Sequence, residues 1–246
     1  MQPLFSIITI TFNAANELPA TLASVKAQTF TDYEHLIVDG KSKDNTVELA
    51  RNSGIANMRI TSEPDRGLYD AMNKGIRQAT GKYLIFLNAG DAFHAPETLK
   101  QIAETITTNH YPDIVYGQTQ LVDAERQFVG MRHLTAPEYL TFDCFKHGML
   151  VCHQAFIAKR ELAEMYDLKY RFSADYEWCL RCLKKMKTSA YTGTTIIDYL
   201  IAGITDKNHK ASLKERYNIM CDYYGTLPTI VRHIGFFVRN LKRKFS

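Results

Sequence analysis

The sequence lacks the loops that mark several common enzyme classes. The first expected strand runs into FNAANE (residues 12–17), which has no glycine, so a dinucleotide-binding fingerprint is missing where it would have to lie. There is no GxxxxGK[ST] loop for phosphates and no GxSxG turn for a serine nucleophile. These absences weigh against hydride transfer, P-loop phosphoryl transfer and acyl transfer through serine.

Cysteine is scarce, and long apolar runs are absent. The five cysteines are an odd number in a chain that begins MQPLFSII, without a basic region, a long apolar run or a cleavage site. Cys179 and Cys182 form a CxxC, but no second CxxC or histidine pair follows at zinc-finger spacing, so we expect them to pack in the core. A reducing cytoplasm is the expected compartment.

Acidic residues are missing from the last fifteen positions, so the formal charge of +4 is concentrated there and the body is nearly neutral. This balance argues against nucleic acid as a partner. The basic residues of this tail are Arg232, Arg239, Lys242, Arg243 and Lys244, and apolar residues recur at helical spacing at Ile230, Ile234, Phe237, Leu241 and Phe245.

Residues 228–246 are therefore predicted to form a basic amphipathic helix that is too short in apolar residues to span a bilayer. Such a helix suits peripheral contact with the inner face of the cytoplasmic membrane. Docking on the body of the protein, with a solvated basic face, is the equal alternative.

What is present is an ordinary globular composition, with 46% hydrophobic and 23% charged residues in 246. Short β-branched runs alternate with helical patterns, which predicts an α/β fold with a mostly parallel central sheet flanked by helices. We expect strands at 5–11, 34–39, 58–62, 82–88 and 113–117, and helices at 18–27, 46–52, 68–79 and 96–109.

The second half is less regular. A ribbon is expected at 118–131, then a short strand, a helix from about Lys159 and a helix from about Ala174. Because no linker or repeat appears, we expect one domain over 1–227, with halves at 1–117 and 118–227 that share a core.

Polar residues close the expected parallel strands. Ligands of open α/β sheets bind at the carboxyl ends of the strands, so one ligand could touch several of these side chains. They are Thr11, Asn13, Asp39, Glu63, Asp65, Arg66, Asn88 and Asp91.

Four stretches together resemble family 2 glycosyltransferases of the GT-A fold. They are FSIITITFNAANEL, QTFTDYEHLIVDGKSKDNT, SEPDRGLYDAMNKGIRQATGKYLIFLNAGD and HQAFIAKREL followed by FSADYEWCLR, and they cover roughly residues 4 to 185 in order. The four stretches are most similar in kind to those of small bacterial enzymes that build capsular polysaccharides and exopolysaccharides, including the colanic acid type. The resemblance implies a nucleotide-diphosphate sugar donor, with a UDP-sugar favoured, and a glycan or lipid-linked oligosaccharide acceptor. It also implies a Mn²⁺ or Mg²⁺ ion and inversion at the anomeric carbon.

For the donor, the resemblance carries over to residues of the first half. Phe12 would stack on the base, with core packing as the alternative. Asp39 would accept from the imide N–H of uracil, with a turn cap as the alternative. Arg66 would reach the donor phosphates, and Asp65 would orient it or touch the ribose. Thr11 and Asn88 complete the expected nucleotide-sugar-binding set.

For the chemistry, the resemblance implies that Asp175 is the general base that takes the proton of the acceptor hydroxyl. The alternative is a helix cap, a place that aspartate favours. His153 and Gln154 would line the acceptor or donor-sugar side. Trp178 would offer a sugar-stacking face or fill the core.

The stretch LIFLNAGDAF, residues 84–93, contains a single acid, Asp91. The family usually has two or three acids there, and this chain has Asn88 and Gly90 at positions that are often acidic. The resemblance implies that the metal bridges Asp91 and the donor diphosphate. Because substrate phosphates and water often complete such a shell, we expect weak metal binding without donor and much tighter binding with it.

Two other functions stay open from the residues alone. A nucleotidyltransferase has a similar sheet but usually has a glycine- and arginine-rich loop after the first strand, unlike TFNAANE. A non-catalytic nucleotide-sugar-binding or scaffold protein would keep the fold and use the tail for recruitment.

Overall fold

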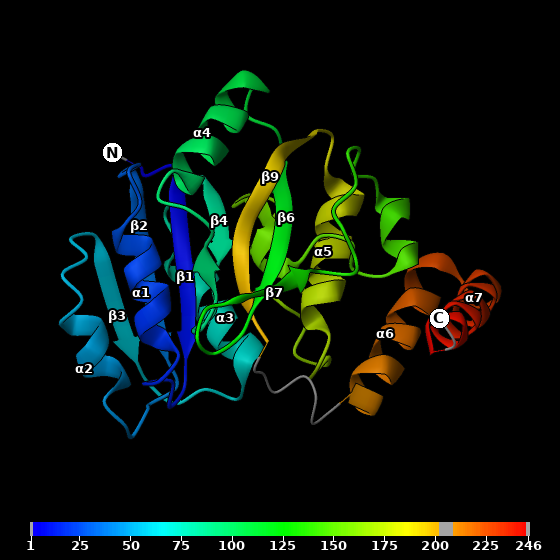
Figure 1. Ribbon diagram of the computed structural model, residues 1–246, viewed down its shortest axis with the longest axis horizontal. Coiled ribbons are helices and arrows are strands. Elements are labelled where there is room, and N and C mark those ends of the chain that lie inside the picture. The colour runs from blue at the N-terminus through cyan, green and yellow to red at the C-terminus, as the bar shows by residue number, and fades with distance from the viewer. Residues whose placement is uncertain (1, 202–208, 245–246) are drawn as a thin grey trace.

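The computed structural model describes residues 2–201 and 209–244, with side chains up to residue 235 apart from residue 209. Nine strands of this part of the chain form one sheet, in the order β3-β2-β1-β4-β8-β6-β9-β5, and β7 pairs with β6 (Figure 1). The first-half elements are β1 (Phe5–Thr11), α1 (Leu18–Lys26), β2 (Tyr33–Asp39), α2 (Thr46–Arg51), β3 (Met58–Ser62), α3 (Leu68–Gln78) and β4 (Tyr83–Phe86).

These elements agree with the sequence prediction to within one or two residues at most ends. The reason is local, because each strand of this half is a short apolar run and α3 carries a regular apolar stripe. Gly75 lies where α3 crosses β1, and a Cβ there would lie 2.5 Å from Cγ2 of Ile8. The glycine thus lets the helix lie close against the sheet.

The second half adds further elements to the same sheet. They are β5 (Ala92–Phe93), α4 (Thr98–Thr108), β6 (Ile114–Val122), β7 (Phe128–Met131), the short 3₁₀ helices η1 (Phe142–His147) and η2 (His153–Ala155), β8 (Phe156–Lys159), α5 (Ala174–Lys185), β9 (Ser189–Leu200), α6 (His209–Tyr224) and α7 (Thr226–Lys244). In Figure 1, α6 and α7 lie beyond α5, on the side away from β3.

The sheet is mixed rather than mostly parallel. Strands β1 to β4 are parallel, as is the pair β6 and β9, but β8 runs antiparallel to both β4 and β6. The pairing of Tyr83 in β4 with Lys159 in β8 also joins the two halves of the chain into one sheet. They therefore share one core.

The helix expected from about Lys159 is wrong. Lys159 ends β8, and the chain turns at once, with the Leu162 N–H donating to the Lys159 carbonyl over 3.0 Å. The segment is then held by a distant side chain, because Asn73 of α3 donates to the Tyr166 carbonyl at 3.0 Å and accepts from its N–H at 2.6 Å. Tertiary contact overrides the local helical pattern here.

The tail is helical as predicted, although α7 begins at Thr226 rather than at 228. Its described apolar residues Leu227, Ile230, Val231 and Ile234 are exposed. The further tail positions that carry the predicted stripe and basic face, from Phe237 onwards, lie outside the described side chains. Within the described residues, no helix is both long and apolar enough to cross a membrane.

Candidate active site

An exposed aromatic ring follows the first strand. β1 ends at Thr11, and the next side chain, Phe12, is 64% exposed. Gly40 directly follows β2, and a Cβ there would lie 2.5 Å from Oδ2 of Asp65 and 3.2 Å from the Phe12 ring. These three residues form one surface, which we call the Phe12 platform. The core alternative for Phe12 is wrong, and a ring beside a carboxylate suits a nucleobase with its ribose.

Asp39 lies beneath the platform and not on it. It has no exposed surface, and its carboxylate accepts hydrogen bonds from Thr11 Oγ1 at 3.0 Å, Ser62 Oγ at 2.6 Å, and the Ser42 N–H at 2.9 Å and hydroxyl. Burial acts to raise its pKa, but the bonds from Ser42, Ser62 and Thr11 outweigh burial and lower the pKa.

In this arrangement the side chains of Asp39 and Thr11 support the strand ends, and their contact with a nucleotide stays a prediction. Both side chains are buried and already bonded to each other. Their bonds fix the ends of β1, β2 and β3, and the bond from the Ser42 N–H makes Asp39 the turn cap that was the alternative.

The start of α3 carries the predicted donor-phosphate residue. The Arg66 side chain is 79% exposed and only loosely paired with Asp70, at 3.4 Å. Asp70 also accepts from the Arg66 N–H at 3.1 Å, and Asp65 accepts from the Gly67 N–H at 2.8 Å. The backbone of this loop is thus fixed by two carboxylates, while the guanidinium of Arg66 stays free to reach an anion beside the Phe12 platform.

The same helix reaches the predicted base. Tyr69, in the first turn of α3, donates a hydrogen bond of 3.1 Å from its hydroxyl to Oδ1 of Asp175. Asp175 lies in the first turn of α5 and is half-buried, so it keeps solvent access while its orientation is fixed. Its Oδ1 also accepts from the Tyr176 N–H at 2.9 Å, which is a bond within the helix start. One short helix therefore joins the donor-side loop to the candidate base.

An aromatic floor lies behind Asp175. Trp178 has no exposed surface, and its ring is stacked on Tyr166 at 5.3 Å and edge-on to Phe86 at 5.7 Å. His153 is 4% exposed and its Nε2 lies 2.7 Å from the Tyr166 hydroxyl. Burial lowers the pKa of His153 to about 4, so the ring is neutral at pH 7.

The predictions of sugar contact by Trp178 and His153 are therefore wrong. Both side chains are core, as the alternative for Trp178 stated, because their polar atoms bond to groups of the protein. Trp178 Nε1 donates to the Glu164 carbonyl at 2.8 Å. Both rings are part of the aromatic floor, which packs behind Asp175 and supports the start of α5.

Asp91 is buried between three elements. It follows β4, is 4% exposed, and accepts from Gln154 Nε2 of η2 at 2.7 Å and from the Leu200 N–H of β9 at 3.1 Å. Burial raises its pKa to about 7, against the opposing effect of these two hydrogen bonds. Gln154 thus contacts Asp91, and at 6% exposure it does not line an open sugar-binding surface, contrary to the prediction.

A second acid at position 90 would be strained and would have to displace the Leu200 side chain. Gly90 has φ of +97°, and a Cβ there would lie 2.7 Å from Leu200 Cδ2. Among residues 2–201 and 209–244 no group of three His, Cys, Asp or Glu residues is placed to hold a metal ion. Asn88 Oδ1, a neighbouring buried oxygen, has no hydrogen-bond partner and adds one neutral ligand. The described residues do not form a preformed cation site, and they fit only an ion that arrives with most of its oxygen ligands.

An arginine lies against the same loop. Arg126, in the turn between β6 and β7, donates from Nη1 to the Gly90 carbonyl at 2.6 Å. This contact fixes the hairpin over the end of β4. Its charge also acts to lower the pKa of Asp91, although burial dominates.

Helix α6 holds the start of α5 in place. The Glu215 carboxylate accepts from the backbone N–H groups of Arg171 at 2.9 Å, Phe172 at 2.8 Å and Ser173 at 2.9 Å. The Ser173 and Ser212 hydroxyls also lie 3.0 Å apart. This cluster of bonds, the Glu215 clamp, satisfies N–H groups just before the helix and so sets where Asp175 lies.

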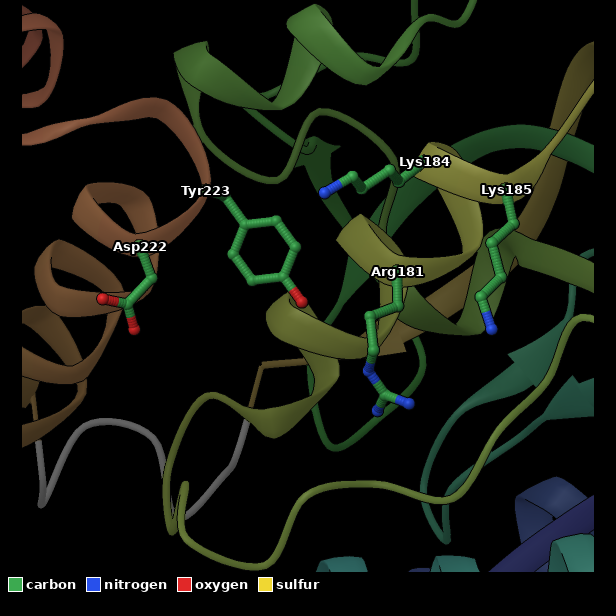
Figure 2. Close-up of a pocket in the computed structure, with 5 residues that line it drawn as sticks. All are labelled: Arg181, Lys184, Lys185, Asp222 and Tyr223. Atoms are coloured by element: carbon green, nitrogen blue, oxygen red, sulfur yellow. The ribbon is translucent and has the colours of Figure 1, made fainter.

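A cavity of about 290 Å³ lies between α5 and α6, lined by Arg181, Lys184, Lys185, Asp222 and Tyr223 (Figure 2). Arg181 is committed to Glu177 at 2.9 Å and to Glu164 at 3.0 Å, and Lys185 pairs with Glu164. Since these cations are neutralised by protein carboxylates, we do not assign the donor to this cavity.

Sequence reasoning missed Tyr69, Arg126 and Glu215. Tyr69 had a usable signal, because it follows the candidate phosphate arginine by three residues in RGLYD, on the first turn of the predicted helix. The other two had none, since the hairpin turn and α6 reach the site only through tertiary folding.

The fold is that of the GT-A glycosyltransferases. The structure of S. aureus TarS 1–349 in complex with UDP-GlcNAc matches with a TM-score of 0.69 at 19% identity, covering 94% of this chain and 73% of that chain. The mannosyltransferase PcManGT from Pyrobaculum calidifontis, in complex with GDP-Man and Mn²⁺, matches with a TM-score of 0.60 at 17% identity, covering 97% and 65%.

The family model for glycosyl transferase family 2 matches residues 6–166, and the chain belongs to this family. A PGL/p-HBAD biosynthesis glycosyltransferase of Mycobacterium bovis is 37% identical over 187 residues, or 73% of this chain and 70% of the relative. The UDP-Glc:α-D-GlcNAc-diphosphoundecaprenol β-1,3-glucosyltransferase WfgD of Escherichia coli is 24% identical over 98% of this chain and 94% of its own length.

Proposed function

We propose that this glycosyltransferase transfers a sugar from a UDP-sugar, with inversion, to a glycan or lipid-linked oligosaccharide acceptor in the synthesis of a surface glycan. The observation that carries the proposal is the placing of α3, whose first turn joins Arg66 beside the Phe12 platform to the Tyr69–Asp175 pair. A relative acts on a diphosphoundecaprenol-linked sugar, and a fold neighbour binds UDP-GlcNAc, which supports this choice of donor and acceptor.

In the proposed reaction the nucleotide lies on the Phe12 platform, with Arg66 on the diphosphate. The acceptor hydroxyl oxygen attacks the anomeric carbon while the bond from that carbon to the β-phosphate oxygen breaks. The acceptor proton passes to the Asp175 carboxylate, and the nucleoside diphosphate leaves with the bonding electron pair. Tyr69 holds the carboxylate so that one oxygen faces the acceptor.

We propose that a divalent cation, Mn²⁺ or Mg²⁺, accompanies the donor, and that Asp91 and Asn88 are the protein residues that would hold it. When bound, such an ion neutralises charge on the departing nucleotide. The Mn²⁺ of a fold neighbour supports the ion, and the single buried carboxylate argues that the donor brings it.

We also propose that α7 touches the surface of an anionic membrane. Leu227, Val231 and Ile234 are exposed and recur at helical spacing, and α7 contains basic but no acidic residues. An apolar stripe with surrounding positive charge fits an anionic lipid surface. This contact would bring the enzyme to a lipid-linked acceptor at the inner face of the cytoplasmic membrane.

The test of the function is UDP release from a panel of UDP-sugars by the wild type and by Asp175→Asn, together with UDP affinity. We expect the variant to lose at least about a hundredfold in turnover, as removal of a general base does, while UDP binds unchanged. Turnover that survives in Asp175→Asn would rule out this base.

The same measurements separate the alternatives. A scaffold protein would bind UDP-sugar and turn none over in any condition. A nucleotidyltransferase would release pyrophosphate from a nucleoside triphosphate.

A further inference from the structure

Arg216 lies next to the Glu215 clamp and near the candidate base. Its Cζ is 5.7 Å from the centroid of the Tyr176 ring, the residue after Asp175. The charge of Arg216 also acts on the Tyr69 phenol, whose hydroxyl donates to Asp175. Because the Glu215 clamp ties α6 to the residues just before α5, the position of Arg216 beside this pair is set by the fold.

No carboxylate neutralises Arg216 within the part of the chain that the structure describes. Its Nε is buried without a hydrogen-bond partner, and the guanidinium lies over the face of the Tyr176 ring, a cation–π contact that adds no negative charge. The neighbouring acid, Glu215, is committed to three backbone N–H groups. Arg181 on the adjacent α5 shows the contrast, since two glutamates pair with it. A half-buried guanidinium with no anionic partner is costly unless a ligand supplies the anion.

The place of Arg216 indicates which ligand supplies it. The Phe12 platform and Arg66 lie at the ends of β1 to β3 and the start of α3, whereas α6 lies beyond α5, on the side away from β3 (Figure 1). The anion that meets Arg216 is thus expected on the acceptor side of Asp175. Guanidinium forks are well matched to phosphate oxygens.

We propose that Arg216 binds a phosphate or diphosphate group carried by the acceptor, next to the hydroxyl that Asp175 deprotonates. This assignment rests on the proposed function, because it takes Asp175 as the base and a nucleotide sugar as the donor. It adds a substrate class, namely acceptors whose reacting sugar is attached through phosphate, and it makes the protein discriminate against the same sugar without phosphate.

The test uses inorganic pyrophosphate as the probe for the acceptor group. The full-length protein is first saturated with UDP in a buffer with EDTA, so that the donor subsite is filled and no metal pyrophosphate forms, and pyrophosphate binding is then measured by calorimetry. We expect binding to the wild type and at least about a tenfold loss in Arg216→Gln, as for a hydrogen-bonded ion pair.

Lys214→Gln is the matched control. Lys214 is an exposed residue of the same helix, two positions away, and the substitution removes the same charge. We expect it to bind pyrophosphate like the wild type. A loss as large as that of Arg216→Gln would show a general charge effect and would overturn the assignment.

Two further outcomes would also overturn it. If the UDP-saturated wild type binds no pyrophosphate, there is no second phosphate site. If Arg216→Gln weakens UDP binding as much as pyrophosphate binding, Arg216 belongs to the donor subsite.

A measurement on the wild type keeps the proposal testable if the variant does not fold. Phenylglyoxal modifies accessible guanidinium groups, and mass spectrometry of peptides locates the modified arginine. We expect pyrophosphate to protect Arg216 in UDP-saturated protein and UDP alone to leave it reactive. Protection by UDP alone, or reactivity unchanged by pyrophosphate, contradicts the proposal.

The experiments distinguish a failure of the proposed function from a failure of the inference about Arg216. A protein that neither binds UDP nor releases it from any UDP-sugar would disprove that function, whatever the result with pyrophosphate. A protein that turns over UDP-sugars but shows no Arg216-dependent pyrophosphate site would disprove only the inference about Arg216.

Discussion

The Tyr69 hydroxyl on α3 donates a 3.1 Å hydrogen bond to the Asp175 carboxylate on α5, across 106 residues of sequence. Because this bond holds the carboxylate in one orientation, we expect Tyr69→Phe to lower kcat roughly tenfold, with UDP affinity unchanged. Steady-state kinetics and UDP titration measure the two quantities.

Tyr166→Phe is the matched control, because its hydroxyl faces His153 and not Asp175. We expect this variant to lose thermal stability while kcat changes little. A kcat of Tyr69→Phe equal to that of the wild type would mean that Tyr69 only packs.

The Phe12 platform predicts the affinity for the nucleotide. Phe12→Ala removes an exposed ring that we place under the base, so UDP should bind about tenfold more weakly at unchanged thermal stability. Tyr111→Ala is the control, because this exposed ring lies near Lys82 at the amino end of β4, whereas Phe12 follows the carboxyl end of β1. Equal UDP affinities for Phe12→Ala and the wild type would place the base elsewhere.

The loop at residues 88–91 contains a single acid, Asp91, which predicts that metal and donor bind together. Calorimetry with Mn²⁺ should show weak binding to the protein alone and at least about tenfold tighter binding once UDP is present. Tight binding without nucleotide would contradict the interpretation of Asp91 and Asn88.

Restoring the acid should not create a metal site. Gly90→Asp adds a Cβ that meets Leu200 Cδ2 at 2.7 Å, at a backbone φ of +97°, and should cost about 1–3 kcal/mol of unfolding free energy. Chemical denaturation and Mn²⁺ titration of the variant test this. A stable Gly90→Asp protein that binds Mn²⁺ tightly without UDP would show that the loop and Leu200 can move apart.

The pH dependence of the unfolding free energy depends on two kinds of buried titratable group, the histidines and Asp91. Burial lowers the pKa of His153 from 6.5 to about 4 and that of His35 to about 3, so between about pH 4 and 6.5 the unfolded chain binds protons that the folded histidines refuse. Their contribution to stability is therefore lost as pH falls. Asp91 has the opposite sign, because its pKa is raised from 3.8 to about 7 and the folded form binds the extra proton.

Urea denaturation at pH 4.5, 5.5 and 6.5 separates the contribution of the buried histidines from that of Asp91. Each net proton changes the unfolding free energy by about 1.4 kcal/mol per pH unit. We expect Asp91→Asn to lose stability more steeply with acid than the wild type, and His153→Gln to lose it less steeply. If the unfolding free energies of all three proteins change with pH in parallel, neither side chain stays buried on acidification.

The exposed stripe of α7 predicts lipid binding. Val231→Glu combined with Ile234→Glu alters only exposed positions, so the fold should persist while flotation with anionic vesicles is lost. Leu168→Glu, an exposed apolar position in the loop before α5, is the control and should float like the wild type. Undiminished flotation of the double variant would show that the exposed stripe of α7 does not bind the membrane.

Much of the first half was predictable, because its elements carry their own local patterns. β1 and β3 agree residue for residue with the apolar runs, and α3 follows its stripe. The loop at 160–173 was not predictable, since its conformation depends on Asn73, which is 93 residues away from Tyr166. The strand β9 was also missed, and it pairs with β6 in a register that shifts at Gln118.

The site was predictable in residue type more than in role. Phe12 is exposed and Asp175 is half-buried, so both side chains are accessible to a ligand, and their roles stay predictions. His153 and Trp178 differ, because an apolar flank in the sequence does not reveal which side chains the rest of the fold will cover. The burial of Asp39 and Thr11 was likewise not visible in the sequence, since burial is a property of the packed chain.

The close approach of Leu200 to Gly90 has an evolutionary consequence. A chain of this family that acquires an acid at position 90 is expected also to shorten or reorient the side chain at position 200, since a Cβ at position 90 would lie 2.7 Å from Leu200 Cδ2. Substitutions at these two positions should therefore be epistatic. Across the family they are expected to change together, so that a bulky residue at position 200 marks the enzymes with one loop carboxylate.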